Sequence, residues 1–345
     1  MKKGFVSAQF NWIFVALAGA FILFLVGILI TNGKDVSDSK VSVEVLQRFD
    51  SLFNSIKTNP GVNLEIPSRK SLVLEVSCIY DPIDDFIISK FQTSQKFTDV
   101  DLENVVIYAP AEISGDRILA KTMKLTVPFR VDNTLFLTDS DTLYISIDPN
   151  PKTRDYFKDL LPTNVTFAEY AQFDEITNKG FDKTVLIVAT DEVNVSKIPK
   201  QLKQKELEAV FITRSIAGLS VSGNISFHKW DNKQKTFLDK GVVKYSNEAH
   251  LLGAILTGDK DVYDCTNRKL EKQIEITAQI LAARSKQLSD ALASRPGKEL
   301  CTLLYLEAAE HFVDLSKHSE DYLDYVHAIT TTDAALVRQS CPTLY

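Results

Sequence analysis

Glycine and cysteine are scarce in this chain of 345 residues, and their scarcity argues against several common kinds of site. Only 13 glycines occur, and no Walker loop or Gly-x-Gly-x-x-Gly loop is present to hold a nucleotide phosphate. A Gly-x-Ser-x-Gly elbow, which presents the nucleophile of many hydrolases, is also missing. The cysteines form no Cys-x-x-Cys pair, and no His-Glu-x-x-His pattern of a zinc hydrolase occurs. We therefore predict no metal and no cofactor, and the catalytic residues, if any, are unknown.

Basic residues are outnumbered by acidic ones. The 39 basic residues less Lys2 and Lys3 leave 37 against 45 acidic residues, so residues 34–345 carry a formal charge of −8. Such an acidic domain is poorly suited to binding nucleic acid, and we expect no nucleic-acid partner. With 45% hydrophobic and 24% charged residues, the chain has the composition of a folded protein.

One long apolar run stands near the amino end. Trp12–Ile30 contains no charged residue, and the uncharged stretch around it extends from Gly4 to Gly33. A helix rising about 1.5 Å per residue needs roughly 20 such residues to cross a hydrocarbon core of ~30 Å. We expect a transmembrane helix at 11–31 in contact with the lipid bilayer. No small-residue cleavage site follows the run, which favours an uncleaved anchor over a signal peptide.

The charges beside this run predict the topology of a single-pass protein of the cell membrane. Lys2 and Lys3 precede the run, and basic residues are retained in the cytoplasm. The amino end is therefore expected to be cytoplasmic and residues 34–345 extracytoplasmic.

Two resemblances concern the same amino end. Met1-Lys2-Lys3-Gly4-Phe5 before an apolar helix resembles type IV pilin-like precursors. That resemblance implies cleavage between Gly4 and Phe5 and packing of the helix into a filament, although Gln9 stands where bacterial pilins typically carry Glu. The segment Phe10-Asn11-Trp12-Ile13-Phe14-Val15 is similar to the start of uncharacterised archaeal single-pass membrane proteins. It implies an archaeal envelope protein and supplies no activity.

The remaining patterns predict an α+β fold: an N-terminal transmembrane helix, a mixed or antiparallel β-rich exported domain with an α/β unit, and a C-terminal helical hairpin. The expected units are a cytoplasmic tail (1–10), the transmembrane helix (11–31), a linker and juxtamembrane helix (32–61), a β-rich domain (62–150), an α/β unit (151–262) and C-terminal helices (263–345).

Several strands are predicted from periodicity. Residues 125–131 alternate apolar and polar side chains as a half-buried strand does, and Pro128 would place that strand at a sheet edge. Asp148-Pro149-Asn150-Pro151 reads as a turn cluster and a domain boundary. Val185–Ala189 and Ala209–Ile212 are short apolar runs, expected to be parallel neighbours joined through a helix near 200–207. Residues 224–230 and 236–243 are expected to form a hairpin.

Helices are predicted in the last third of the chain. A short helix is expected at 249–256. From Thr266 onward apolar residues recur at helical spacing, with breaks at 294–297 and near Ser319.

An even number of cysteines in an exported domain favours disulfides over metal. Cys301 begins one predicted helix, and an antiparallel return of similar length brings Cys341 back beside it. Cys265 lies at the far end of a helix of about 40 Å and cannot reach Cys301. We predict the pairs Cys301–Cys341 and, by elimination, Cys78–Cys265.

Sequons of the form Asn-x-Ser/Thr mark candidate glycosylation sites. They are Asn164, Asn194 and Asn224.

Other clusters of polar residues have a structural explanation. His311 and His318 with Glu307 and Asp314 fit the solvated face of a helix better than a metal site. Asp81-x-x-Asp84-Asp85, Asp139-x-Asp141 and Asp259-x-Asp261-x-x-Asp264 lack the Gly and Glu of a calcium loop and are expected in turns. Tyr305, Tyr322 and Tyr325 could line a groove but are expected to pack.

Three functions follow as hypotheses. The first is an accessory, assembly or binding component of the cell envelope that acts by contact with protein partners. The second is a membrane-anchored hydrolase of peptide or glycan, which a pocket with converging carboxylates would favour. The third is a pilin-like filament subunit.

Overall fold

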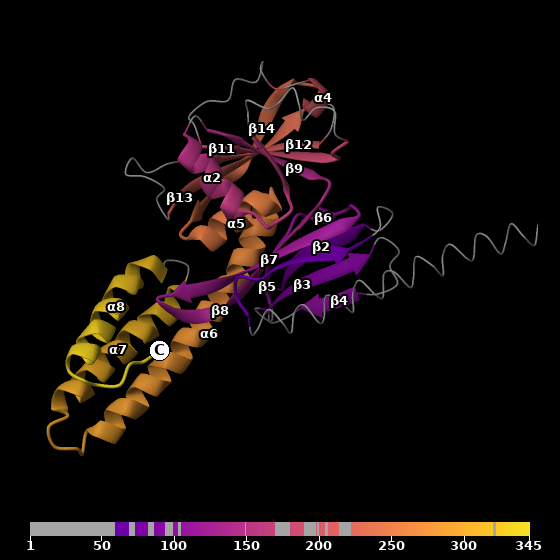
Figure 1. The fold of residues 1–345 in the computed structure, drawn as a ribbon. Helices are drawn as coiled ribbons and strands as arrows, with labels where there is room; N and C mark the ends of the chain where they lie inside the picture. The colour runs from indigo at the N-terminus through magenta and orange to yellow at the C-terminus, as the bar shows by residue number, and fades with distance from the viewer. Residues whose placement is uncertain are drawn as a thin grey trace, which may run out of the picture.

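The computed structural model has an α+β fold, as predicted (Figure 1). It describes residues 59–68, 73–81, 86–93, 99–102, 105–148, 150–169, 180–189, 198, 200–203, 206–213, 222–319 and 322–345. The strands of these residues form three sheets, two with four strands and one with six.

The two four-stranded sheets pack face to face as a sandwich. One has the order β1 (Asn63–Pro67), β7 (Arg117–Val127), β8 (Phe129–Asp139), β5 (Val106–Tyr108). The other has the order β4 (Asp99–Leu102), β3 (Phe86–Thr93), β2 (Leu74–Asp81), β6 (Glu112–Ile113). Their shared core takes alternate side chains from both sheets, including Leu74, Phe91, Ile107, Ala120 and Leu135.

The six-stranded sheet is mixed. Its order is β10 (Thr166–Glu169), β9 (Thr142–Ile147), β11 (Lys183–Val188), β12 (Glu206–Ile212), β13 (Gly223–Asp231), β14 (Thr236–Tyr245). The first four strands are parallel, and β13 and β14 form the predicted antiparallel hairpin. The predicted parallel pairing of the two apolar runs is confirmed, but the described helix between them, α4 (Lys200–Lys203), is only 4 residues long.

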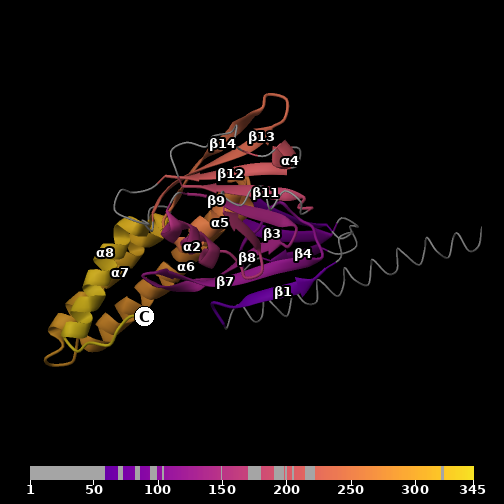
Figure 2. The same ribbon diagram turned by 45° about the horizontal axis from the view of Figure 1, so that its top comes forward.

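Helices fill the space between the sheets and extend beyond it (Figures 1 and 2). The short ones are α2 (Pro151–Leu160) and α5 (Glu248–Thr257), and the long ones are α6 (Lys260–Leu292), α7 (Glu299–Lys317) and α8 (Tyr322–Arg338). The first turns of α6 pack between sandwich and sheet, where the Tyr263 ring lies 5.8 Å from Tyr108 and 6.0 Å from Phe227. The rest of α6 leaves the sheets and, with α7 and α8, forms a projecting helical arm.

The predicted strand at 125–131 is in fact two strands. Val127 on β7 pairs with Phe129 on β8, and Pro128 lies at the tip of the hairpin between them. Apolar and polar side chains continue to alternate through the tip of the hairpin, so periodicity alone could not locate the turn. Proline has no N–H group and is tolerated at such a tip as well as at a sheet edge. The tip packs on the arm, since the Phe129 ring lies 5.7 Å from that of Phe312.

The boundary expected at 148–151 also differs in the structure. Strand β9 precedes that boundary but pairs with β10 and β11, so the chain passes from the sandwich to the larger sheet at the Ser140-Asp141 turn. The expected turn cluster begins helix α2, in which Asn150 is the N-cap and accepts a hydrogen bond from Lys152 N at 3.0 Å. Asn followed by Pro is a helix-start signal as well as a turn signal.

Both disulfides are present in the predicted pairing. Cys78 on β2 is bonded to Cys265 on α6, and Cys301 on α7 is bonded to Cys341 after α8. The first joins the sandwich to the long helix, and the second ties the chain end to the arm.

The predicted cytoplasmic tail, transmembrane helix and most of the linker unit lie outside the described residues. Within the described part of the chain, no helix is both long and apolar enough to cross a bilayer.

Candidate functional site

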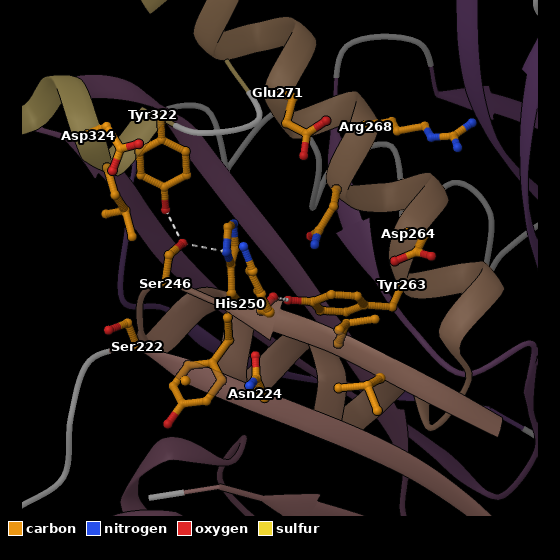
Figure 3. A pocket seen from close by; sticks show the side chains of 17 residues that line it. Ser222, Asn224, Ser246, His250, Tyr263, Asp264, Arg268, Glu271, Tyr322 and Asp324 are labelled. Carbon is orange, nitrogen blue, oxygen red and sulfur yellow. Dashed lines mark hydrogen bonds between the residues drawn. The ribbon is translucent and has the colours of Figure 1, made fainter. Parts of the chain in front are cut away.

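A pocket of about 650 Å³ lies where the β13–β14 hairpin meets α6 and the start of α8 (Figure 3). Its lining is mostly polar. It includes Ser222, Asn224, Ser246, His250, Tyr263, Asp264, Asn267, Arg268, Glu271, Tyr322 and Asp324.

A hydrogen-bonded network forms one wall of this pocket. Ser246 Oγ lies 2.8 Å from Nδ1 of His250 and is also hydrogen-bonded to the Tyr322 hydroxyl. Asn247 Nδ2 donates to the same hydroxyl at 3.0 Å. The network therefore joins the start of α5 to the start of α8, two segments far apart in the sequence.

The local sequence explains why these side chains meet. Asn247 is the N-cap of α5, and its Oδ1 accepts a hydrogen bond from His250 N at 2.9 Å. The cap holds the first turn in place, so that Ser246, just before the helix, faces the histidine three residues into it. The signal was a Ser-Asn pair before an apolar run, which marks a helix start but says nothing about Tyr322.

His250 is buried and uncharged. It is 6% exposed, and burial lowers its pKa to about 4. Its Nε2 has no hydrogen-bond partner among the described residues. Since the Tyr322 oxygen accepts from Asn247, a consistent proton order runs from Tyr322 to Ser246 to Nδ1, which leaves the histidine proton on Nε2.

This arrangement makes a weak catalytic pair. A serine nucleophile needs a base that can accept its proton and a carboxylate that stabilises the resulting imidazolium. Burial opposes that charge on His250, and no described carboxylate bonds to its second nitrogen. The pair is better suited to ordering the pocket wall than to nucleophilic attack.

The pocket also has carboxylates from two helices. Glu271 and Asp264 come from α6 and Asp324 from α8. Asp264 forms an ion pair with Lys260, one turn earlier on the same helix. Three carboxylates therefore line the pocket, and one of them is neutralised by a lysine.

The three predicted tyrosines have separate roles. Only Tyr322 lines the pocket, where burial raises its pKa. The Tyr305 hydroxyl is 2.6 Å from the carbonyl oxygen of Pro342, and Tyr325 stacks on His318.

The candidate glycosylation sites are dispersed. Asn164 is exposed, and its Nδ2 donates to Glu65 Oε2 at 3.0 Å. Asn224 is exposed at the pocket. Asn194 lies outside the described residues.

The metal-like clusters have structural roles where they are described. His311 Nε2 is 3.6 Å from Glu307 Oε1, and Asp259 caps α6 by accepting from Asp261 N and Val262 N. Asp139 is buried and accepts from Asp141 N within the turn after β8. The described part of the chain contains no group of three or more His, Cys, Asp or Glu residues arranged to hold a metal.

A second candidate surface lies on the arm. A groove of about 620 Å³ runs between α6 and α7, lined by Ala282, Ala283, Lys286, Leu306, Ala309, Glu310, Val313 and Asp314. Large apolar side chains are exposed along it, with Leu306 at 42% and Val313 at 40%. Leu303, one turn before Leu306, is 62% exposed. We call Ala282, Ala283, Leu303, Leu306, Ala309 and Val313 the arm face.

Comparisons with known proteins add no assignment. No family model, no curated protein and no solved structure matches this chain.

Proposed function

We propose that this protein is a membrane-anchored, extracytoplasmic component of the cell envelope that works by binding protein through its arm face. The observation that carries the proposal is the continuous row of exposed apolar side chains on α7 beside the groove. A helix hairpin facing only water is expected to be polar on its outer side.

The spacing of the arm face favours contact with protein. Leu303, Leu306 and Val313 follow one another at three and seven residues, which keeps them on one side of α7. Burying an exposed leucine contributes about 1.5–3 kcal/mol at most, so three such positions are enough to anchor an interface.

The proposed location rests on the sequence. The apolar run at 11–31 supplies the anchor, and the similarity of its start to archaeal single-pass membrane proteins supports an envelope role. Two disulfides and no free cysteine suit an oxidising compartment.

Cross-linking in native membranes tests the proposal. We would compare the full chain with the L306D variant, purify each in mild detergent after cross-linking, and identify bound proteins by mass spectrometry. L238D is the matched control, because Leu238 is also exposed but lies on β14. We expect L306D to lose its bound protein and L238D to keep it. Equal recovery from all three chains would contradict the proposal.

A membrane-anchored hydrolase of peptide or glycan is the second candidate, favoured by Glu271 and Asp324 in one pocket. In that case the E271Q variant would no longer hydrolyse substrates in a library of glycans and peptides that the unaltered chain hydrolyses, while its melting temperature would stay the same. Absence of turnover by the unaltered chain would remove this candidate.

A further inference from the structure

The arm face is complementary to itself in size and in charge. Helix α7 contributes the large side chains Leu306 and Val313, and α6 contributes the small side chains Ala282 and Ala283. Charge follows the same division, with Lys286 on α6 and Glu310 and Asp314 on α7. At the groove, α7 therefore carries the large and the acidic side chains, and α6 carries the small and the basic ones.

We propose that the arm face binds a second copy of this chain, so that α6 and α7 of the two copies pack as a four-helix bundle; this rests on the proposed function. A two-fold axis parallel to the helices places α6 of each copy over α7 of the other. The leucine and valine side chains then lie over alanines, as ridges over a groove, and each Lys286 lies near a Glu310.

The register of the arm supports that pairing. Ser289 Oγ donates to Thr302 O at 3.1 Å, which fixes the level of α6 against α7. Counting along the antiparallel helices from this contact, Lys286 lies level with Tyr305, beside Leu306, and about 7.5 Å along the axis from Glu310. A rotation about an axis parallel to the helices keeps these levels, so both Lys286–Glu310 pairs stay within reach of their side chains.

The alternative two-fold axis, perpendicular to the helices, is disfavoured. It places α7 on α7 and brings the acidic residues Glu310 and Asp314 of both copies together, with large side chains over large ones. Like charges at a contact weaken it, and overlapping large side chains leave gaps elsewhere.

The size of the face is adequate. Helix α7 has 19 residues. A face about 28 Å long and two helices, or about 20 Å, wide would remove roughly 1,100 Å² from water in total, at the lower end for a specific interface. Two chains held in one bilayer would meet more often than in solution, which suits an interface of this size.

A photoreactive side chain at position 306 of the full-length protein tests the arrangement in native membranes. We expect a product of twice the chain mass, in which position 306 is joined to residues 276–290 of the second copy. The same probe at Leu238 is the control and should give no such product. Joining to α7 of the second copy would overturn the proposed axis.

The outcome also separates this inference from the proposed function. A product that contains only a different protein would overturn self-pairing and leave the contact function in place. No product from position 306 would overturn both.

Charge reversal supplies an independent test in purified full-length protein. K286E and E310K alone should each weaken dimerisation roughly tenfold, measured by light scattering in detergent, because two pairs are lost in each dimer. The double variant K286E/E310K should restore it. If the double variant is as weak as the singles, Lys286 does not face Glu310 and the pairing is wrong.

Discussion

At the scale of residues, the polar wall of the pocket depends on one uncharged histidine. His250 accepts the hydrogen bond of Ser246 only while Nδ1 is unprotonated, and burial keeps it so. Protonation would place a buried positive charge on the ring and a proton on Nδ1, the atom that accepts from Ser246, and so would oppose the chain of hydroxyls from Tyr322.

This predicts a loss of stability in acid. The pKa of His250 is about 4 in the folded state and about 6.5 in the unfolded state, so between these values the unfolded chain binds more protons. The free energy of unfolding therefore falls as the pH is lowered through this window, by about 2 kcal/mol between pH 7 and pH 4.5.

Urea unfolding of the unaltered chain and of H250N at pH 7 and pH 4.5 measures this contribution of His250 to the free energy of unfolding. The difference between the two proteins should shrink by that amount in acid. A difference that is the same at pH 7 and pH 4.5 would show that His250 does not titrate as proposed.

A second residue-scale prediction concerns Gly253 on α5. A Cβ there would lie 2.5 Å from Cδ1 of Tyr108, whose ring is stacked on Phe136 with centroids 5.5 Å apart and cannot easily move. We expect G253A to destabilise by about 1–3 kcal/mol from overpacking, despite the higher helix propensity of alanine. The melting temperature of G253A measures this destabilisation.

The control is G180A, where nothing lies within 4 Å of the added carbon. It should change the free energy of unfolding by less than about 0.5 kcal/mol. If both variants melt together, the contact with Tyr108 is not tight.

At the scale of elements, sequence periodicity predicted most helices and strands but not where some of them end. The β13–β14 hairpin and the breaks between α6, α7 and α8 follow from strong local signals. Helix α6 begins at Lys260 rather than Thr266, because Asp259 caps it and was expected only in a turn. Strand β9 could not be assigned to its sheet, since its partners come later in the chain.

The candidate site was less predictable than the fold. Tyr322 and Ser246 are 76 residues apart and meet because α7 returns along the arm and brings the start of α8 back to the sheets. The arm face could not be predicted from the sequence for a different reason. Leu303 and Leu306 are as apolar as the buried Tyr305 and Phe312 on the same helix. Periodicity finds an apolar helix but does not say which of its sides is covered.

The disulfide Cys301–Cys341 holds the last residues of the chain against the arm. Its sequence separation of 40 corresponds to a stabilisation of about 2–4 kcal/mol through the unfolded state. We expect the C301A/C341A variant to lose about that much free energy of unfolding, measured by calorimetry. The Tyr305 hydroxyl should also lose its contact with Pro342, which ultraviolet difference spectra detect. An unchanged unfolding curve would contradict this account.

At the scale of the whole molecule, one helix connects every layer. Helix α6 packs between the sandwich and the six-stranded sheet, is bonded to β2 through Cys265, and continues into the arm for 33 residues in all. The pocket and the arm face are thus carried on the same helix, the pocket on its first third and the arm face on its last.

The proposed anchor gives a whole-molecule prediction. The full chain should remain in the membrane after alkaline extraction, and a variant lacking residues 2–33 should be released. Intact mass of the native protein decides between anchor and filament subunit, because a pilin-like protein would begin at Phe5. A full chain that washes off the membrane would contradict both.

The two disulfides have a further consequence for a protein exposed to proteases. Together they close residues 78–265 and residues 301–341 into two covalent rings. A single cut at any peptide bond inside either ring leaves all fragments joined. A nicked molecule would therefore keep its full mass on a non-reducing gel and separate only after reduction, so cleavage in the six-stranded sheet would not by itself shed the arm from the rest of the protein.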